Sequence, residues 1–145
     1  MKKRVILILM TLLLIGAALN AGAEASKEEN LSRFLGEWAS DEYRLYIRVE
    51  GDEVFARLSE VNGDFVWEFN RCYFDLDEGC LYGSNYVRYR QFIDWDAMEL
   101  VQDHWSTGDL AFTCFAFEDD EDVLNIRDVP YINKSLTLRP VDDEA

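Results

Sequence analysis

Apolar and polar residues alternate with a period of two along most of the chain. In Tyr43–Val49 the odd-numbered positions are apolar, and Arg44 and Arg48 stand between them, so a strand here would bury one face and solvate the other. The same alternation continues on both sides of Asn62-Gly63. This dipeptide favours a two-residue type I′ hairpin turn, because both central residues of that turn need positive φ.

Further strands separated by short polar turns are predicted to the end of the chain. They cover Tyr86–Ile93, Met98–Trp105, Leu110–Phe117, Val123–Ile126 and Ser135–Arg139. This spacing is typical of an antiparallel up-and-down meander. A meander of about eight or nine strands would curl and close, because closure removes exposed sheet edges. We therefore predict an all-β barrel over residues 37–141, with a two-sheet sandwich as the alternative.

One segment before the strands has helical signals. Ser26 and Glu29 form a capping box, and Gly36 suits the left-handed position at the C-terminal end of a helix. The apolar residues on one face of such a helix are Leu31, Phe34 and Leu35. A short capping helix within residues 24–36 is predicted, covering an apolar surface.

Residues 1–23 have the three-part layout of a secretory signal peptide. Lys2, Lys3 and Arg4 precede the apolar run Val5–Leu19, and small residues follow to Ala23. The run is shorter than the ~20 residues that a membrane-spanning helix needs, so a retained anchor is the weaker alternative. Because the first cysteine is Cys72, a lipoprotein is disfavoured. We expect an exported protein with no stable membrane insertion after cleavage, ending in a short acidic tail at residues 142–145.

The chain is strongly acidic, with 29 Asp and Glu against 14 Lys and Arg and a formal net charge of −15. Cleavage after Ala23 would remove three positive charges and no acid, giving −18. Such a chain is repelled by phosphate backbones and anionic lipid surfaces, so nucleic acid and peripheral membrane partners are not expected. Disorder is also disfavoured, because 49% of the residues are hydrophobic and 14% aromatic.

The stretch Trp67–Gly83 contains two cysteines around three acids and a glycine. Asp75 and Asp77 have the spacing of calcium ligands, but Gly79 falls where a third ligand is needed and the twelfth position, Tyr86, is no ligand. No metal site is predicted here. The acids and the glycine instead favour a hairpin tip.

Two registers of that hairpin differ in their consequence for the cysteines. A loop at residues 75–77 would put Cys72 opposite Cys80, where a bridge is possible, whereas Gly79 in the left-handed position would put Cys72 opposite Ser84. The glycine favours the second register. Cys114, in an apolar run, is expected to be a buried core residue. We therefore hypothesise that no disulfide is obligatory.

Catalytic signals are weak. His104, the only histidine, lies mid-strand, and one histidine with three scattered cysteines offers no close pair of zinc ligands. The chain also has no glycine-rich phosphate loop, so we predict no cofactor. Paired carboxylates carry no information here, because so many acids always provide some suitable pair.

Aromatic residues are more informative. Four Trp, seven Tyr and nine Phe exceed what one core of this size usually needs, and several strands carry aromatics on both faces. Either the barrel interior and its covered outer face take them all, or some line a cavity or a rim that binds a ligand. Candidate interior-lining residues are Tyr43, Leu45, Trp67 and Phe69. Trp95, between two aspartates at a predicted hairpin tip, is the aromatic least expected to be buried.

Gly36-Glu37-Trp38, which enters the first strand directly after a short helix, resembles the G-x-W entry of lipocalin-like barrels. The resemblance implies a structural role, in which Trp38 closes the base of the barrel. It also implies an arginine stacked on Trp38, for which Arg127 and Arg139 are the candidates.

A second resemblance covers more of the chain. The segments Trp67–Phe69, Cys72–Asp75 and Leu81–Gly83, with the acidic-tipped hairpin through Phe115–Phe117 to Leu124, look like a group of small exported bacterial proteins that have no established activity. Their usual pattern has a tryptophan in the closing strand, and Leu124-Asn125-Ile126 departs from it. The resemblance implies export and a β fold, and supplies no catalytic residue.

The sequence thus does not identify a specific activity. The primary hypothesis is a secreted, non-enzymatic barrel that binds a small apolar ligand or a partner protein at its open end. The alternatives are a carbohydrate-binding module that uses exposed aromatics and a hydrolase that uses carboxylates.

Overall fold

The computed structural model describes residues 27–109, 112–119 and 121–142. The chain forms two compact units, residues 1–33 and 34–145. In the first unit the described residues form one short helix at 27–32, within which the Ser32 hydroxyl donates to the Glu29 carbonyl oxygen at 2.6 Å. The predicted signal peptide, the cap residue Ser26 and most of the acidic tail lie outside the described residues. No helix in the described part of the chain is long and apolar enough to cross a membrane.

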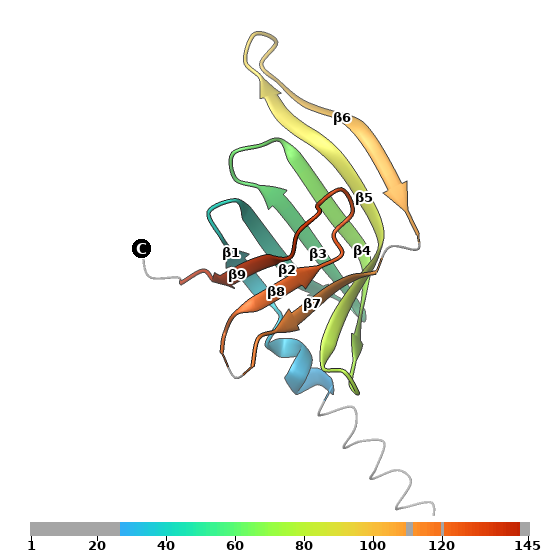
Figure 1. Cartoon of the computed structure of the whole chain (residues 1–145). Coiled ribbons are helices and arrows are strands. Elements are labelled where there is room, and N and C mark those ends of the chain that lie inside the picture. Colours follow the sequence, from blue (N-terminus) through green and yellow to red (C-terminus); the bar gives the residue numbers. More distant parts are fainter. Residues whose placement is uncertain (1–26, 110–111, 120, 143–145) are drawn as a thin grey trace, which may run out of the picture. The chain divides into compact units, whose positions relative to one another are not determined.

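The second unit is all-β in its described residues, apart from turns (Figure 1). Its strands are β1 (Gly36–Ala39), β2 (Tyr43–Glu50), β3 (Glu53–Glu60), β4 (Phe65–Asp75), β5 (Cys80–Asp94), β6 (Glu99–Gly108), β7 (Thr113–Phe117), β8 (Leu124–Arg127) and β9 (Leu136–Pro140). The alternation in Tyr43–Val49 reappears as β2, in which Tyr43, Leu45 and Ile47 are buried.

Eight of these strands form a closed antiparallel ring. They follow one another in the order β4-β3-β2-β1-β9-β8-β7-β5, and pairing of β4 with β5 closes the circle. The predicted antiparallel barrel is therefore confirmed. The ladders differ in length, since β4 and β5 pair from Asp75↔Cys80 to Phe65↔Arg90, whereas β5 pairs with β7 over the short stretch Leu81–Gly83.

The remaining strand, β6, lies outside the ring. β5 is 15 residues long and changes partner along its length, from β7 at Leu81–Gly83 to β6 at Tyr86–Asp94. Asn85, between the two stretches, has a φ of 55°. The β5–β6 hairpin consequently extends beyond the barrel (Figure 1). A simple meander would pair β6 with β7, and here β7 returns to β5.

Large apolar side chains fill the barrel interior. Those below 2% exposed include Leu45, Ile47, Leu58, Trp67, Phe69, Leu81, Phe115, Leu124, Ile126 and Leu138. The Phe69 and Phe115 rings meet edge to face with centroids 5.7 Å apart. A Cβ at Gly83 would lie 3.0 Å from Phe69 and 3.1 Å from Phe115, so this glycine lets both rings press against β5.

Three local predictions need correction. The β3–β4 hairpin forms, but neither Asn62 nor Gly63 has positive φ, so the turn is not type I′. It is wider, because Glu60 turns back to accept a hydrogen bond from the Phe65 amide at 3.2 Å. The predicted helix is shorter than 24–36 in its described part, and Gly36 begins β1 with a φ of 112° instead of ending the helix.

The β4–β5 tip also adopts a register that differs from both predicted ones. The loop covers 76–79, so Asp75 faces Cys80 and Cys72 faces Gly83. Gly79 has the expected positive φ, 66°. The Asp75 carboxylate accepts hydrogen bonds from the amides of Asp77 and Glu78, which is the usual reason for an aspartate at the start of a turn.

Candidate functional site

One end of the barrel is hollowed and carries the loops at residues 40–42, 61–64 and 128–135; we call this end the mouth. Three adjoining hollows there, of about 290, 210 and 320 Å³, all include Tyr43 in their walls. The first, which we call the mouth hollow, reaches furthest toward the core. Its walls are Tyr43, Glu60, Trp67, Arg88, Tyr131, Ile132, Asn133 and Lys134.

Arg88 is the central charged residue of the mouth hollow. Its guanidinium carbon lies 3.7 Å from the ring centre of Phe65, 4.3 Å from that of Tyr131 and 5.3 Å from that of Trp67. The Nε atom is buried and has no hydrogen-bond partner. Within the described residues, no carboxylate lies within ion-pair distance of this guanidinium. The aromatic rings supply favourable cation–π contacts, but they do not satisfy the buried N–H group.

The strand register places Arg88 at this position. Arg88 stands directly opposite Trp67 in the β4–β5 ladder, so both side chains are on the inner face of the barrel wall. Trp67 donates from Nε1 to the carbonyl oxygen of Pro130 at 2.8 Å, which ties the β8–β9 connection across the mouth. Tyr131 follows with a φ of 70° and turns its ring onto Arg88.

Tyr131 is also held from β5. Its hydroxyl acts on that of Tyr86, because burial and then the neighbouring Tyr131 raise the pKa of Tyr86. The Tyr86 ring lies over Gly108 of β6, where a Cβ would come within 2.5 Å of the ring. A side chain at position 108 would therefore force the Tyr86 ring to move.

Lys134, the other basic residue in the wall of the mouth hollow, already has a counter-charge. Lys134 is ion-paired with Glu42, with Nζ 2.6 Å from Oε2, and this hydrogen bond raises the pKa of Lys134. Glu60 accepts from the Phe65 amide. Burial and then the charge of Glu60 raise the pKa of Tyr43, so this hydroxyl stays protonated well above neutral pH. Arg88 is thus the cation at the mouth whose charge is still available to a ligand.

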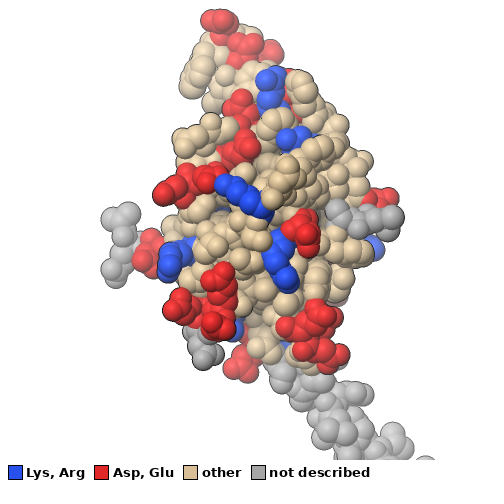
Figure 2. All heavy atoms as spheres, in the orientation of Figure 1, with Lys and Arg blue, Asp and Glu red and all other residues tan. Residues whose placement is uncertain are grey.

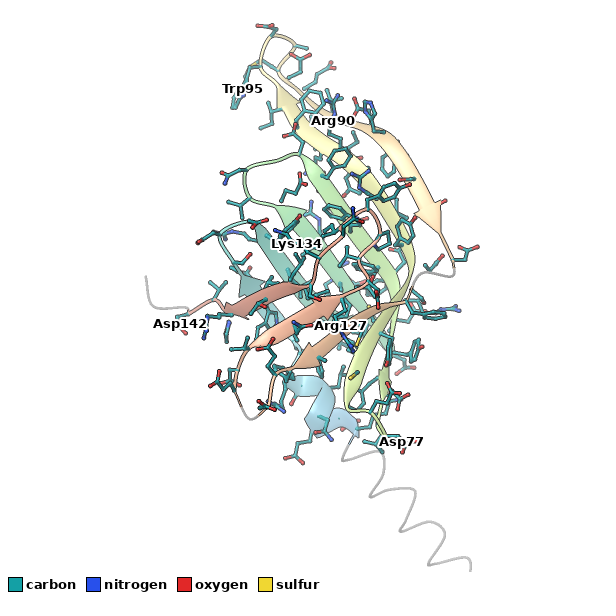
Figure 3. All side chains as sticks on the ribbon, viewed as in Figure 1. Asp77, Arg90, Trp95, Arg127, Lys134 and Asp142 are labelled. Carbon is teal, nitrogen blue, oxygen red and sulfur yellow. The ribbon has the colours of Figure 1, made fainter. Side chains whose placement is uncertain are left out.

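The sequence-predicted site residues separate into three groups. Tyr43 and Trp67 both line the mouth hollow. Leu45 and Phe69 are packed in the interior, below 2% exposed. Trp95 is 72% exposed at the tip of the β5–β6 hairpin, away from Lys134 (Figure 3).

The structure gives Trp38 a packing role. It is buried, meets Phe117 edge to face with centroids 5.5 Å apart, and donates to the Phe34 carbonyl oxygen at 3.0 Å. Neither candidate arginine is stacked on it in the described residues: Arg127 donates to Cys114, and Arg139 stands opposite Ala39.

Sequence reasoning missed Arg88, Tyr131 and Lys134. The sequence does contain a signal for Arg88. Residues 86, 88, 90 and 92 share one face of the predicted strand, and on this face Arg88 and Arg90 lie between two aromatic residues. Tyr131 and Lys134 lie in a connection without periodicity, and no pattern of the sequence points to them.

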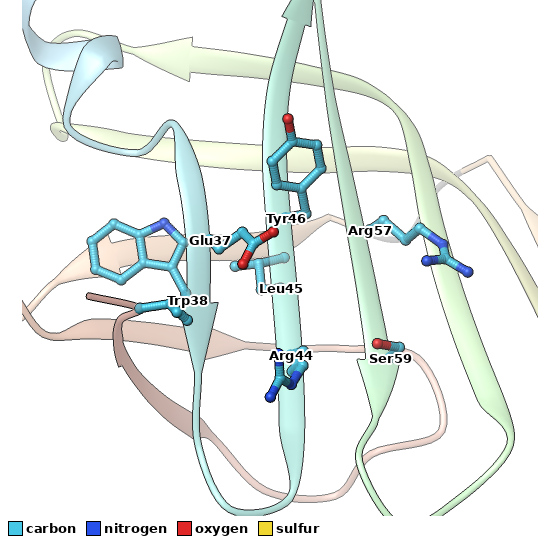
Figure 4. A pocket seen from close by; sticks show the side chains of 8 residues that line it. Glu37, Trp38, Arg44, Leu45, Tyr46, Arg57 and Ser59 are labelled. Atoms are coloured by element: carbon cyan, nitrogen blue, oxygen red, sulfur yellow. The ribbon is translucent and has the colours of Figure 1, made fainter. Parts of the chain in front are cut away.

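A second hollow, of about 250 Å³, lies on the outside of β1, β2 and β3 (Figure 4). Glu37, Tyr46 and Arg57 stand side by side across these strands. Arg57 faces Glu68 at 3.7 Å, and Glu68 also accepts from the Tyr89 hydroxyl. The charge of this arginine is thus already met by a neighbouring side chain. The view in Figure 2 shows acids around the edge and at the upper tip of the molecule, with basic side chains nearer the middle.

The geometry around His104 is not that of a catalytic pair. This histidine occupies a bulge in β6 with a φ of 56°, its side chain is exposed, and Nδ1 lies 2.8 Å from Oδ1 of Asp103. That carboxylate already binds Arg90 through two hydrogen bonds, of 2.8 and 2.7 Å. In the part of the chain that the structure describes, no group of three or more His, Cys, Asp or Glu side chains could hold a metal ion.

Comparisons with known proteins return no match to a family model, to a curated protein or to a solved structure. The lipocalin-like resemblance and the resemblance to exported bacterial proteins stay predictions. The mouth hollow is the candidate site because it combines aromatic walls, connection to the core and an uncompensated cation.

Proposed function

We propose that the protein is an exported, non-enzymatic binding protein that holds a small ligand at the barrel mouth. The ligand has an apolar or aromatic part and an anionic group such as a carboxylate. The observation that carries this proposal is Arg88, whose buried Nε lacks a partner while three aromatic rings surround its guanidinium. An anion that accepts from this guanidinium would supply both the missing hydrogen bond and the missing counter-charge.

The residues that line the hollow indicate the polarity and the size of the rest of the ligand. Tyr43, Trp67 and Tyr131 line the hollow, and Tyr131, which is 64% exposed, offers most of the apolar surface. The volume of about 290 Å³ is just below the ~300–1,000 Å³ range of small-molecule pockets, which favours a small ligand. Because large side chains fill the interior beyond Trp67, the ligand sits at the mouth and does not enter the barrel deeply.

Paired probes that differ in charge alone test this proposal. We expect octanoate and phenylacetate to bind the mature chain saturably, at one site, and at least ~10-fold more tightly than octanamide and phenylacetamide, which is about 1.4 kcal/mol. Isothermal titration calorimetry measures both the affinity and the stoichiometry.

Two variants locate the site. Arg88→Gln is expected to remove the preference for the anions, whereas Arg44→Gln, in the outer hollow, leaves it unchanged. Equal binding of charged and neutral probes, or an unchanged preference in Arg88→Gln, contradicts the proposal. Binding of soluble glycans that is lost in Trp95→Ala would favour the carbohydrate-binding alternative instead.

A further inference from the structure

Two of the three cysteines meet on the outer surface of the barrel, where β5 pairs with β7. Tyr82 stands opposite Cys114 in this ladder, and Cys80 is two residues before Tyr82, so all three side chains are on the same face of the sheet. Cys80 and Cys114 are therefore diagonal neighbours across two paired strands. Their side chains are close enough to act on each other electrostatically.

The two sulfur atoms differ in their exposure to solvent, so that a reagent would meet them one after the other. Cys114 is buried, and Nη2 of Arg127 lies 3.3 Å from its Sγ. Cys80 is more exposed, and its Sγ lies 3.4 Å from the Glu78 carbonyl oxygen in the β4–β5 tip. Arg127 is the positive charge that acts on both sulfurs. Cys80 is thus the thiol that a reagent in solution reaches first.

Cys72 stands apart from this pair. It faces Gly83 in the β4–β5 ladder, on the inner side of the wall, with its Sγ 3.9 Å from the Phe69 carbonyl oxygen. Burial raises the pKa of the Cys72 thiol to about 12, so it remains an unreactive thiol at neutral pH. It serves as an internal reference for the other two.

The pair also lies where a short ladder closes the barrel. β5 and β7 are joined over Leu81–Gly83, and the whole β5–β6 hairpin leaves the ring between Cys80 and Cys114. A covalent bond between these two residues would close a long loop and hold the ring shut where its ladder is short. Cross-links that close long loops are the ones expected to stabilise most through the unfolded chain.

We propose that Cys80 and Cys114 are a disulfide-forming pair, oxidised by a small-molecule disulfide such as oxidised glutathione or by an equivalent disulfide donor outside the cytoplasm. The Cys80 thiolate attacks one sulfur of the donor, which forms a mixed disulfide and releases one thiolate. The Cys114 thiolate then attacks the Cys80 sulfur, which closes the protein disulfide and releases the second thiolate. The two protons lost by the cysteines leave with the two released thiols, and the two electrons reduce the donor.

The present surroundings slow the first step at neutral pH. Burial and then the neighbouring Cys114 raise the pKa of Cys80 to about 11, and Arg127 opposes this rise. The thiolate fraction is therefore small at pH 7, and the exchange is expected to accelerate as the pH rises toward 11. This inference is independent of the proposed mouth ligand.

The test is a thiol count on the full, folded chain after reduction and after incubation with oxidised glutathione at pH 8.5. We expect three free thiols before oxidation and one afterwards, with peptide mapping joining Cys80 to Cys114. The Cys72→Ser variant is expected to fall from two thiols to none. The Cys114→Ser variant is expected to stop at the mixed disulfide on Cys80.

Thermal unfolding supplies a second readout. Oxidised wild-type chain should melt several degrees above its reduced form, and Cys80→Ser, which changes a half-buried position, should show no difference between the two conditions. Three thiols remaining after oxidation of folded wild-type protein overturn the proposal. A bond mapped to Cys72 overturns it as well.

Discussion

The Trp67 indole and the Arg88 guanidinium stand opposite each other in the β4–β5 ladder, with the guanidinium carbon 5.3 Å from the indole ring centre. On the inner side of this pair the barrel interior is filled by apolar side chains. On the side toward the mouth loops lies the mouth hollow. A tryptophan that completes the core and an arginine that lacks a counter-charge therefore mark the boundary between the packed interior and the mouth hollow.

Tyr131 should contribute to binding much more than to folding. It covers Arg88 at 4.3 Å and is 64% exposed. A cation–π contact of this kind is worth about 0.5–2 kcal/mol, so we expect Tyr131→Ala to weaken octanoate binding roughly 3- to 10-fold. Thermal stability should change by less than about 0.5 kcal/mol, as is usual for a surface substitution. Calorimetric titration and thermal unfolding measure the two effects.

The matched control is Tyr131→Phe, which keeps the ring over Arg88 and removes the hydroxyl that acts on Tyr86. Its affinity should stay within about twofold of wild type, because each tenfold change requires about 1.4 kcal/mol. If the alanine and phenylalanine variants lose affinity equally, the ring does not act through the guanidinium.

Gly83 should be intolerant of a side chain although it lies in a regular strand. A methyl group there would sit at 3.0–3.1 Å from the Phe69 and Phe115 rings, inside normal contact distance. We expect Gly83→Ala to lower the free energy of unfolding by about 1–3 kcal/mol, the usual cost of overpacking a core. Urea denaturation followed by circular dichroism measures this change.

A double mutant isolates the cause of that loss. Phe115→Leu makes room next to Gly83, so Gly83→Ala should cost less in the Phe115→Leu background than in the wild type, with a coupling of at least about 0.5 kcal/mol. Additive costs in the double mutant would mean that the alanine acts on the backbone and not through the ring.

The sequence predicted the elements in which alternation is regular. β2 follows the pattern in Tyr43–Val49, because one strand face is buried and the other faces water. The exposure of Trp95 and the burial of Cys114 were also predicted and are confirmed. In each case the deciding factor is local, either the strand period or the polarity of the neighbours.

What the sequence did not predict depends on contacts between distant segments. Gly83 resembles a turn residue, yet β5 runs straight through it because two phenylalanine rings from β4 and β7 occupy the space above. Arg88 was not recognised as a site residue because strand arginines usually face solvent, and its aromatic surroundings include Tyr131, more than 40 positions later. The contact between Cys80 and Cys114 depends on β7 pairing with β5, where a simple meander would pair it with β6.

The Asp103 carboxyl should stay ionised to a lower pH than is usual for a partly exposed aspartate. The two hydrogen bonds from Arg90, and then that from His104, hold the pKa of its carboxyl well below the ordinary value of 3.8. For a lowered pKa, the stabilisation is complete above the ordinary value and is lost only as the pH falls through the lowered one. The Arg90–Asp103 pair on the β5–β6 hairpin should therefore be unchanged from pH 8 to about pH 5.

A carboxyl carbon-13 titration by NMR measures this pKa directly. In Arg90→Gln the midpoint of Asp103 should move up toward 3.8, because the first cause of the shift is gone. A wild-type midpoint already near 3.8 would show that the pair does not persist in solution.

The tryptophans should report separately on the mouth and on the hairpin tip. Trp38 and Trp67 are buried, at 5% and 1% exposure, whereas Trp95 and Trp105 are 72% and 55% exposed. Trp105 is shielded on one side, because it stacks on Tyr89 with ring centres 4.5 Å apart. We expect acrylamide to quench wild-type emission in two classes, and Trp95→Phe to remove most of the accessible class and shift the remaining emission to shorter wavelength.

Acrylamide is the suitable quencher because it is neutral, whereas iodide would be repelled by a chain of net charge −15. A ligand in the mouth hollow touches the environment of Trp67 and not that of Trp95, so the emission change caused by octanoate should be fully retained in Trp95→Phe. Loss of that change in Trp95→Phe would place the binding site at the hairpin tip. The same emission change, abolished in Arg88→Gln but kept in Trp95→Phe, would assign the ligand to the side of the barrel wall where Trp67 faces Arg88.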